Sequence, residues 1–427
     1  MIKKSLTKII LIIVAASIVT LGVIKLAALG SAAINALNSE QNETNKKDSV
    51  TINFIHWSNF PREIFTSFSQ KYPNIKVEFE QYGRQHYPEV QRARMSSGEN
   101  VDIMAVMEND YESFVKNGYL VNLTDKDYIN NYRLRALEDI AELRQDKKVF
   151  AVPYKSWVLG IWYNKIFFNR YGIEIPNNYN EFLEACRILK ANGVNPMVLG
   201  CRDEWVSSYI YYIRIWNSAG YDRNWFRKLN SGEITWMHPS IVQSFEDVES
   251  FIKKGYILKD SINLSYHQAF NEFIKGRAAM CLAGDWSMDM IEPGIEKAIE
   301  LGMFPIPYND EGLAKMVPGT NAGFLMGIFS GSHKKDEADL LLDYLSQPEV
   351  AQVYVDETKS SSNILEVDYK KLKYNQSWEQ LRMSEYITPL TVILPRNVQN
   401  RLNKSAKELL IGSKTARQIL QELDDIQ

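Results

Sequence analysis

The chain has 427 residues, of which 45% are hydrophobic and 24% are charged. That is enough to bury a sizeable core and, by length, to form two or three domain-sized units. The formal net charge of -3 and the lack of a long basic run in the folded region disfavour nucleic acid and other polyanions as partners.

The N-terminus has the layout of a secretory signal. Three lysines within the first eight residues precede an apolar stretch, 9–24, and small residues follow at 30–33. We predict a signal peptide over 1–33 with Ala33 as its last residue, and hence an exported protein that is extracellular or at the cell surface, or periplasmic if an outer membrane exists. Lys25 interrupts the apolar run before leucines resume, so an uncleaved N-terminal anchor stays open.

The cysteine count argues against a disulfide framework and against a lipid anchor. The three cysteines are Cys186, Cys201 and Cys281, and none lies in the signal region. We interpret them as small buried residues, with a Cys186–Cys201 bridge as the alternative. The five histidines are scattered without ligand spacing, so we expect neither a metal nor a cofactor.

The first half of the folded chain alternates strands and helices after a polar, flexible tether over 34–49. Apolar runs bounded by turn residues predict the strands, and apolar residues three and four apart predict the helices, as with Ile64, Phe65 and Phe68. The elements expected are strands over 51–56, 75–79 and 102–107, and helices over 62–71 and 111–117, the last ending at Gly118.

The second half is richer in helices. They are expected over 180–191, 240–253, 266–275 and 335–345, with a capping Asn180 at the start of the first. Alternating strands and helices predict an α/β fold. Because no low-complexity linker divides the chain, we expect lobes built from interleaved segments.

Several segments resemble the family 1 extracellular solute-binding proteins, the group that includes the maltose-binding components of ABC importers. The strongest is Phe273–Met280, followed by Gly284, Asp285 and Trp286, a helix, glycine turn, strand and tryptophan in that order. Weaker matches are 71–77, 152–154 with 162–165, and 178–182. Together they span about Val50 to Leu345.

The resemblance implies a two-lobed periplasmic-binding-protein-like fold with a hinge and an interlobe cleft. It implies a first lobe of 50–157 plus 324–365 and a second lobe of 158–323 plus 366–427. It also implies a monomer that captures a carbohydrate, best an oligosaccharide, by hinge closure and delivers it to the permease subunits of an ABC importer.

Candidate ligand-binding residues follow the predicted strand ends, where sugar hydroxyls would meet amides and carboxylates, and sugar faces would meet aromatic rings. The candidates are Trp57 and Asn59, with His56 and Ser58, after the first strand; Gln81 and Tyr82, with Glu80, after the second; and Asn109 and Asp110, with Glu108, after the third. The resemblance adds Trp157 at one hinge crossing, Asn321 with Gly323 at the other, Asp285, Trp286, Trp205 and Glu204 on the opposite wall, and Arg396.

Plainer interpretations of these residues stay open. The tryptophans could pack in the core or the hinge, and the polar residues could lie in solvated turns.

Two other functions also stay open. A sensor docking on a membrane receptor would use the same cleft. A glycosidase would need two carboxyl groups about 5 Å apart, for which Asp110 and Asp285 are the candidates, but we predict no catalytic residue. The acidic residues near the cleft favour a neutral or basic sugar, while uronic acids stay open.

Overall fold

The computed structural model describes residues 49–84, 86–98, 100–142, 148–291, 299–310, 317–369, 386–387 and 393–426. The predicted signal or anchor segment and the predicted tether up to Asp48 lie outside these residues. Within the described ranges, no helix is both long and apolar enough to cross a membrane.

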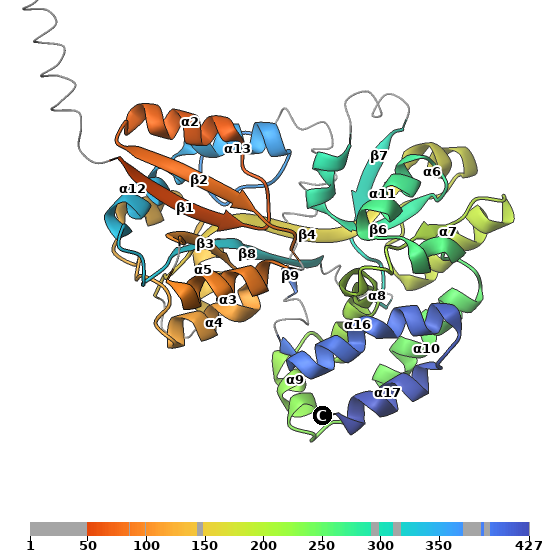
Figure 1. Cartoon of the computed structure of the whole chain (residues 1–427). Helices are drawn as coiled ribbons and strands as arrows, with labels where there is room; N and C mark the ends of the chain where they lie inside the picture. The colour runs from red at the N-terminus through yellow and green to blue at the C-terminus, as the bar shows by residue number, and fades with distance from the viewer. Residues whose placement is uncertain are drawn as a thin grey trace, which may run out of the picture.

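The strands of both lobes join in one sheet system, in the order β2-β1-β3-β8-β4-β6-β5, with β7 beside β4 and β9 beside β8 (Figure 1). β1 pairs in parallel with β2 and β3, whereas β8 is antiparallel to both β3 and β4. The strands are β1 (Val50–His56), β2 (Ile75–Gln81), β3 (Ile103–Val106), β4 (Val152–Asn164), β5 (Met197–Val198), β6 (Met280–Gly284), β7 (Leu301–Phe304), β8 (Val317–Ile328) and β9 (Tyr386–Ile387).

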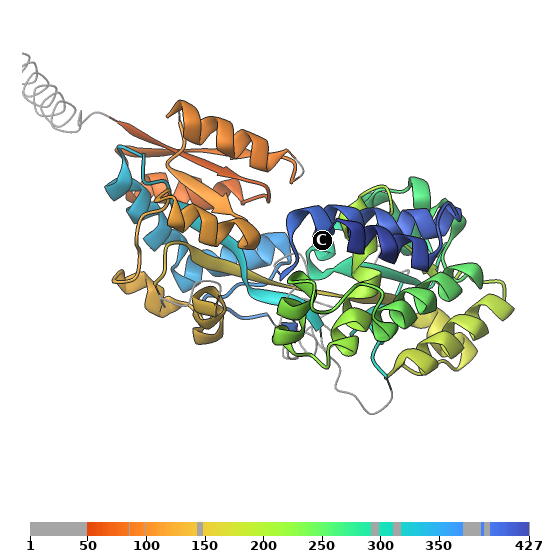
Figure 2. The same cartoon turned by 90° about the horizontal axis from the view of Figure 1, so that it is seen from below.

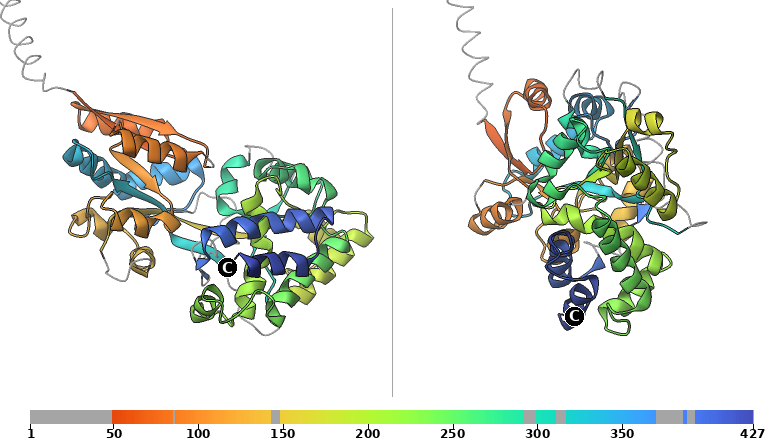
Figure 3. Two further views of the ribbon diagram at one scale, coloured as in Figure 1. Left: turned by 60° about the horizontal axis from the view of Figure 1, so that its bottom comes forward. Right: turned by 90° about the vertical axis from the view of Figure 1, so that its right-hand side faces the viewer.

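Helices cover the sheets of two distinct lobes (Figure 2). In the second lobe α16 packs on α8 and α17 packs on α10, so the C-terminal pair of helices lies against that lobe (Figure 3). The helices are α2 (Arg62–Lys71), α3 (Tyr87–Ser97), α4 (Glu108–Lys116), α5 (Leu134–Glu142), α6 (Lys165–Tyr171), α7 (Tyr179–Ala191), α8 (Glu204–Ser218), α9 (Arg223–Asn230), α10 (Pro239–Lys253), α11 (Tyr266–Ile274), α12 (Lys335–Leu345), α13 (Pro348–Thr358), α16 (Arg396–Ile411) and α17 (Ala416–Asp425), with 3-10 turns η1 (Asp127–Asn131), η2 (Lys259–Asn263) and η3 (Asp285–Met290).

The two longest strands, β4 and β8, run from one lobe into the other (Figure 1). Their ladder shifts register between Lys155 and Trp157, so that Lys155 pairs with Gly323 but Trp157 pairs with Thr320. Phe324, next to this irregularity, has a φ of +47°, a left-handed conformation that is strained for a bulky side chain. The predicted lobe boundaries, at 157 and 324, fall at this irregularity.

The structure confirms most predicted elements and corrects several of their ends. α2 and α12 have the predicted bounds, and β2 continues two residues further, through Gln81. α4 begins at Glu108, three residues before the predicted start, and β6 lies two residues later than the range 278–282 that the sequence predicts. The cap of α7 is Asn178 and not Asn180, since its side chain accepts the N–H of Glu181 at 3.0 Å.

The three cysteines are buried and form no disulfide. The prediction of small buried residues is therefore confirmed, and the alternative Cys186–Cys201 bridge is wrong. Burial raises the pKa of each thiol, because the apolar surroundings disfavour the thiolate.

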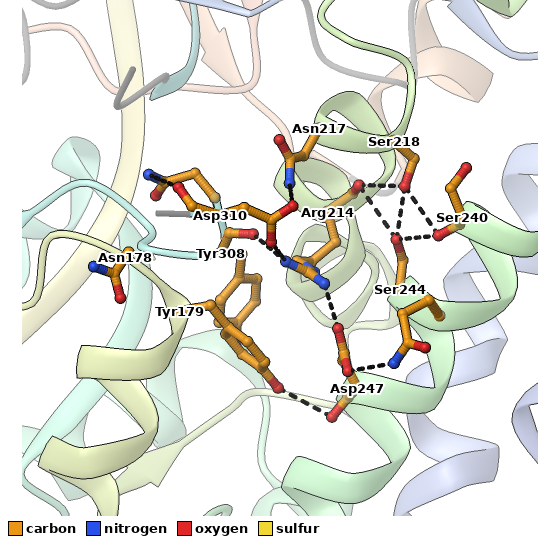
Figure 4. Close-up of polar contacts among 12 residues, drawn as sticks. Asn178, Tyr179, Arg214, Asn217, Ser218, Ser240, Ser244, Asp247, Tyr308 and Asp310 are labelled. Atoms are coloured by element: carbon orange, nitrogen blue, oxygen red, sulfur yellow. Dashed lines mark hydrogen bonds and ion pairs between the residues drawn. The ribbon is translucent and has the colours of Figure 1, made fainter. Parts of the chain in front are cut away.

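A buried arginine holds several elements of the second lobe together (Figure 4). Arg214 of α8 donates to the carbonyl of Tyr308 at 3.1 Å, forms an ion pair with Asp247 of α10, and pairs with Asp310 at 2.6 Å. Its guanidinium also lies 5.0 Å from the ring centre of Tyr179. Arg214 thus links α7, α8, α10 and the segment that follows β7.

Candidate functional site

Trp286 lies in the first turn after β6, and its position depends on the glycine that ends that strand. A Cβ added to Gly284 would come within 2.2 Å of the Trp286 ring, so the indole lies directly against the bare backbone. The indole is half-buried, which leaves part of one aromatic surface accessible.

Four rings gather around this tryptophan, and we call the five rings, which come from four elements, the aromatic group. Trp286 is 5.7 Å from Trp157 at an interplanar angle of 79°, 6.2 Å from Trp205 at 41°, and 6.0 Å from Tyr266 at 30°. Tyr209 completes the aromatic group, edge-on to both Trp157 and Trp205. Trp157, Tyr209 and Tyr266 are buried, whereas Trp205 and Trp286 are half-buried.

A hydrogen bond from Trp157 ties the aromatic group to the first lobe. The indole Nε1 of Trp157 donates to Oε1 of Glu108, the first residue of α4, at 3.0 Å. Trp157 lies over Gly323, where a Cβ would come within 2.8 Å of the indole. The Trp157 ring is therefore fixed on one edge by a carboxylate and beneath by a glycine.

Asp285 lies beneath the aromatic group and not on its surface. Its side chain is 2% exposed, and it accepts the backbone N–H of Val158 in β4 at 3.3 Å. Tyr266 is similarly anchored, since its hydroxyl bonds Ser287 and accepts the N–H of Gly284 at 3.1 Å. These contacts join η3, β4 and α11 below the exposed rings.

At the end of β1, two buried nitrogens have no hydrogen-bond partner: Nε2 of His56 and Nε1 of Trp57. His56 accepts the N–H of Ser58 through Nδ1 at 2.7 Å, which places the proton of the neutral ring on Nε2. Burial, with Lys155 and Arg84 nearby, lowers the His56 pKa to about 3, so the ring is neutral. Trp57 is packed by Tyr87 and Phe324.

The predicted residues after β2 form a polar cluster of their own. Glu80 pairs with Arg94 at 2.7 Å and accepts a hydrogen bond from the Tyr82 hydroxyl, and Arg94 also contacts that hydroxyl at 2.8 Å. The Tyr82 bond lowers the pKa of Glu80, although partial burial opposes it. Gln81, which is exposed, reaches the backbone carbonyl of Trp57 at 3.5 Å.

The remaining predicted residues are not part of the aromatic group. Asn59 and Asn109 are exposed, with no side-chain bond among the described residues. Burial raises the pKa of Asp110, while the positive charges of Arg396 in α16 and Arg92 in α3 oppose that rise. Asn321 lies in β8, but its side chain is outside the described part of the structure. Glu204 begins α8 beside Trp205.

Sequence reasoning missed Tyr209 and Tyr266, and it did not single out Arg84. Tyr266 starts α11 behind a capping box formed by Ser265 and Gln268, a pattern readable in the sequence that predicts the helix but not the neighbours of its first ring. Arg84 lies with its guanidinium 5.5 Å from the Trp57 ring, a contact that the sequence spacing gives no hint of. In the described ranges, no group of three or more His, Cys, Asp or Glu could hold a metal ion.

Comparison with known proteins identifies the class to which this arrangement belongs. A family model described as bacterial extracellular solute-binding protein matches residues 58–352. The multiple sugar-binding protein of Streptococcus mutans serotype c is 24% identical over 349 residues, which cover 79% of this chain and 80% of that protein.

Solved structures share the architecture. RafE of Streptococcus pneumoniae, solved in complex with raffinose, has a TM-score of 0.75 at 20% identity over 88% of this chain and 98% of that one. A sugar transporter protein of Bacillus licheniformis in complex with stachyose has a TM-score of 0.72 at 19% identity over 88% and 99%. With the two-lobed α/β fold confirmed and the family match covering more than half of its length, the chain belongs to the bacterial extracellular solute-binding proteins.

Proposed function

We propose that this protein captures an oligosaccharide between its lobes and delivers it to the permease subunits of an ABC importer. The observation that carries the proposal is the aromatic group, in which Trp205 and Trp286 present half-buried ring surfaces at the junction of the lobes. The apolar face of a sugar stacks on such rings, and two accessible rings suit a ligand of more than one sugar unit. The sugar-binding relatives support the same ligand class.

The hinge is proposed to lie where β4 and β8 cross between the lobes, at the register shift beside Trp157 and Phe324. A sugar held first by one lobe gains contacts from the other lobe only in a closed form. Such differential contacts shift the population toward closure, which the permease would recognise.

We further propose that the protein binds its ligand without cleaving it. A glycosidase needs one accessible carboxylic acid poised over the scissile bond. Asp285 is 2% exposed and accepts a backbone N–H, which suits a positioning role beneath the rings. The export and surface location predicted from 1–33 stay part of this proposal.

A thermal-shift screen of the protein from Val50 onward against mono- and oligosaccharides tests the proposal. A ligand bound only by the folded state must raise the Tm. We expect a reproducible rise for one oligosaccharide class, lost in Trp286→Ala and unchanged in Trp225→Ala, and no shorter products on long incubation. No rise with any carbohydrate would refute the binding function, and released products would make the protein a glycosidase.

A further inference from the structure

The end of β1 gathers hydrogen-bond donors and positive charge without matching acceptors. His56 carries its proton on Nε2, and both this nitrogen and Nε1 of Trp57 are enclosed without a partner. The guanidinium of Arg84 lies 5.5 Å from the Trp57 ring and makes no ion pair with a described residue. Because a buried donor left unpaired costs free energy, this surplus of donors suggests that something else supplies the acceptor.

The positive charge of Lys155 also lies close to the end of β1. The ammonium of Lys155 lies 4.6 Å from the ring centre of Phe324, which in turn contacts the rings of His56 and Trp57. Lys155 and Arg84 together lower the pKa of His56 beyond the effect of burial, which shows that both charges reach it. Lys155 is 2% exposed and donates to the Ser360 hydroxyl at 2.9 Å, so its ammonium group lies inside the protein close to these rings.

The acidic residues that follow the neighbouring strands are already engaged. Glu80 is bound by Arg94 and Tyr82, and Glu108 accepts the indole N–H of Trp157. Asp285 accepts a backbone N–H from β4. Their presence in the sequence favoured a neutral or basic ligand, but in the structure none of these three carboxylates is placed to balance Arg84.

Two further arginines contribute positive charge at the same edge of the sheet. β1 and β3 are parallel and in register at Phe54 and Ile103, so their carboxyl ends lie side by side. After β3, the positive charges of two arginines, Arg92 from α3 and Arg396 from α16, act on Asp110, and neither arginine makes an ion pair with a described residue. These two guanidinium groups add positive charge at this edge of the sheet.

Building on the proposed function, we propose that the sugar ligand is acidic, and that its anionic group binds Arg84 beside Trp57 at the end of β1. A carboxylate or sulfate supplies several acceptor oxygens, and a guanidinium binds such a planar or branched anion through two parallel bonds. Arg84 is exposed, so its side chain turns from the Trp57 ring toward the ligand and uncovers the indole N–H as a further donor. The small net charge of the whole chain does not oppose this local arrangement.

The test is calorimetric titration of the whole folded chain with pairs of oligosaccharides that differ only in charge. One arm uses uronate oligomers and their carboxyl-reduced neutral counterparts, and the other uses sulfated oligomers and their desulfated counterparts. Each pair is measured on the unaltered protein, on Arg84→Gln, and on the matched control Arg62→Gln, an exposed arginine on α2.

We expect one acidic member to bind at least tenfold more tightly than its neutral counterpart. Arg84→Gln should reduce that preference about tenfold, the usual effect of losing a bond to a charged group, and Arg62→Gln should leave it unchanged. The arm in which the preference appears identifies the anion as carboxylate or sulfate. Equal or tighter binding of the neutral members would overturn the acidic ligand while leaving sugar capture intact. A preference that survives in Arg84→Gln would overturn the role of Arg84, and no binding by any sugar would reject the proposed function itself.

Discussion

Trp157 donates its indole N–H to Glu108 at 3.0 Å, although the two residues are 49 positions apart and belong to different parts of the sheet. Glu108 begins α4 behind the first-lobe strand β3, whereas Trp157 lies midway along β4, where that strand leaves the first lobe. The bond therefore sets the angle at which the Trp157 edge meets the face of Trp286.

Glu108→Ala is expected to weaken ligand binding by about 2 kcal/mol, because a hydrogen bond to a charged acceptor is lost and the indole is no longer held. Glu108→Gln keeps an acceptor oxygen and should lose less. Calorimetry with the sugar found by screening measures both, and tryptophan emission reports the freed indole. Glu112→Ala, on the same helix and paired with exposed Lys116, is the control. Equal losses in Glu108→Ala and Glu112→Ala would contradict the positioning role.

Gly284→Ala should mimic Trp286→Ala in binding while leaving the fold intact. The added methyl would lie 2.2 Å from the indole, and β6 is otherwise compatible with alanine because the φ of Gly284 is -81°. The ring must leave its place, and we expect each variant to lose about 1 kcal/mol or more of binding free energy. Since both act on one contact, the double variant should be no weaker than either single one. Additive losses would show that Gly284 acts elsewhere.

Stability should fall as the pH falls from about 6.5 towards 3, in part because of His56. The folded-state pKa of His56 is lowered to about 3 by burial and by Lys155 and Arg84, while the unfolded value is near 6.5. In that window the unfolded chain binds the proton and the folded chain does not, so acid favours unfolding.

His56→Asn should flatten this pH dependence, because the amide oxygen can still accept the Ser58 N–H and cannot titrate. Urea unfolding at several pH values measures the slope, and His86→Asn, at an exposed site, is the matched control. An unchanged slope in His56→Asn would show that other groups govern the acid sensitivity.

Arg214→Met should lower the free energy of unfolding by about 3 kcal/mol, because it leaves the largely buried carboxylate of Asp247 without its partner. Asp310→Asn should cost about 1 kcal/mol or less, since the Asp310 side chain is 63% exposed and solvent screens that pair. Thermal or urea unfolding ranks the two variants. A larger loss in Asp310→Asn would mean that the segment after β7, and not the buried pair, controls stability.

Local patterns in the sequence predicted the elements because they depend on neighbouring residues. The apolar spacing of Ile64, Phe65 and Phe68 predicted α2, and Gly276 predicted the left-handed end of α11. The start of α4 was predicted too late because Glu108, Asn109 and Asp110 are polar and have no apolar period. Glu108 and Asp110, as acidic residues in the first turn, instead favour a helix N-terminus.

The site was predictable in part. The resemblance to a known family placed Trp157, Trp205 and Trp286, and the structure brings these three together. The resemblance did not predict the pairing of Glu80 with Arg94 or the position of Arg84 over Trp57. The contacts of such long, flexible side chains depend on distances between groups in the folded chain, which the sequence does not give. The ligand roles of all the predicted residues, the tryptophans included, stay predictions.

The place of β8 between β3 and β4 has a consequence for how the chain must be made. β3 and β4 are synthesised early, yet the strand that joins them spans Val317–Ile328 and emerges only after most of the second lobe. Until then both strands present unpaired edges, the kind of surface that templates aggregation, and the late, sequence-distant pairing slows folding. A nascent or truncated chain that stops before β8 is thus prone to self-association, even if the residues already synthesised have folded correctly.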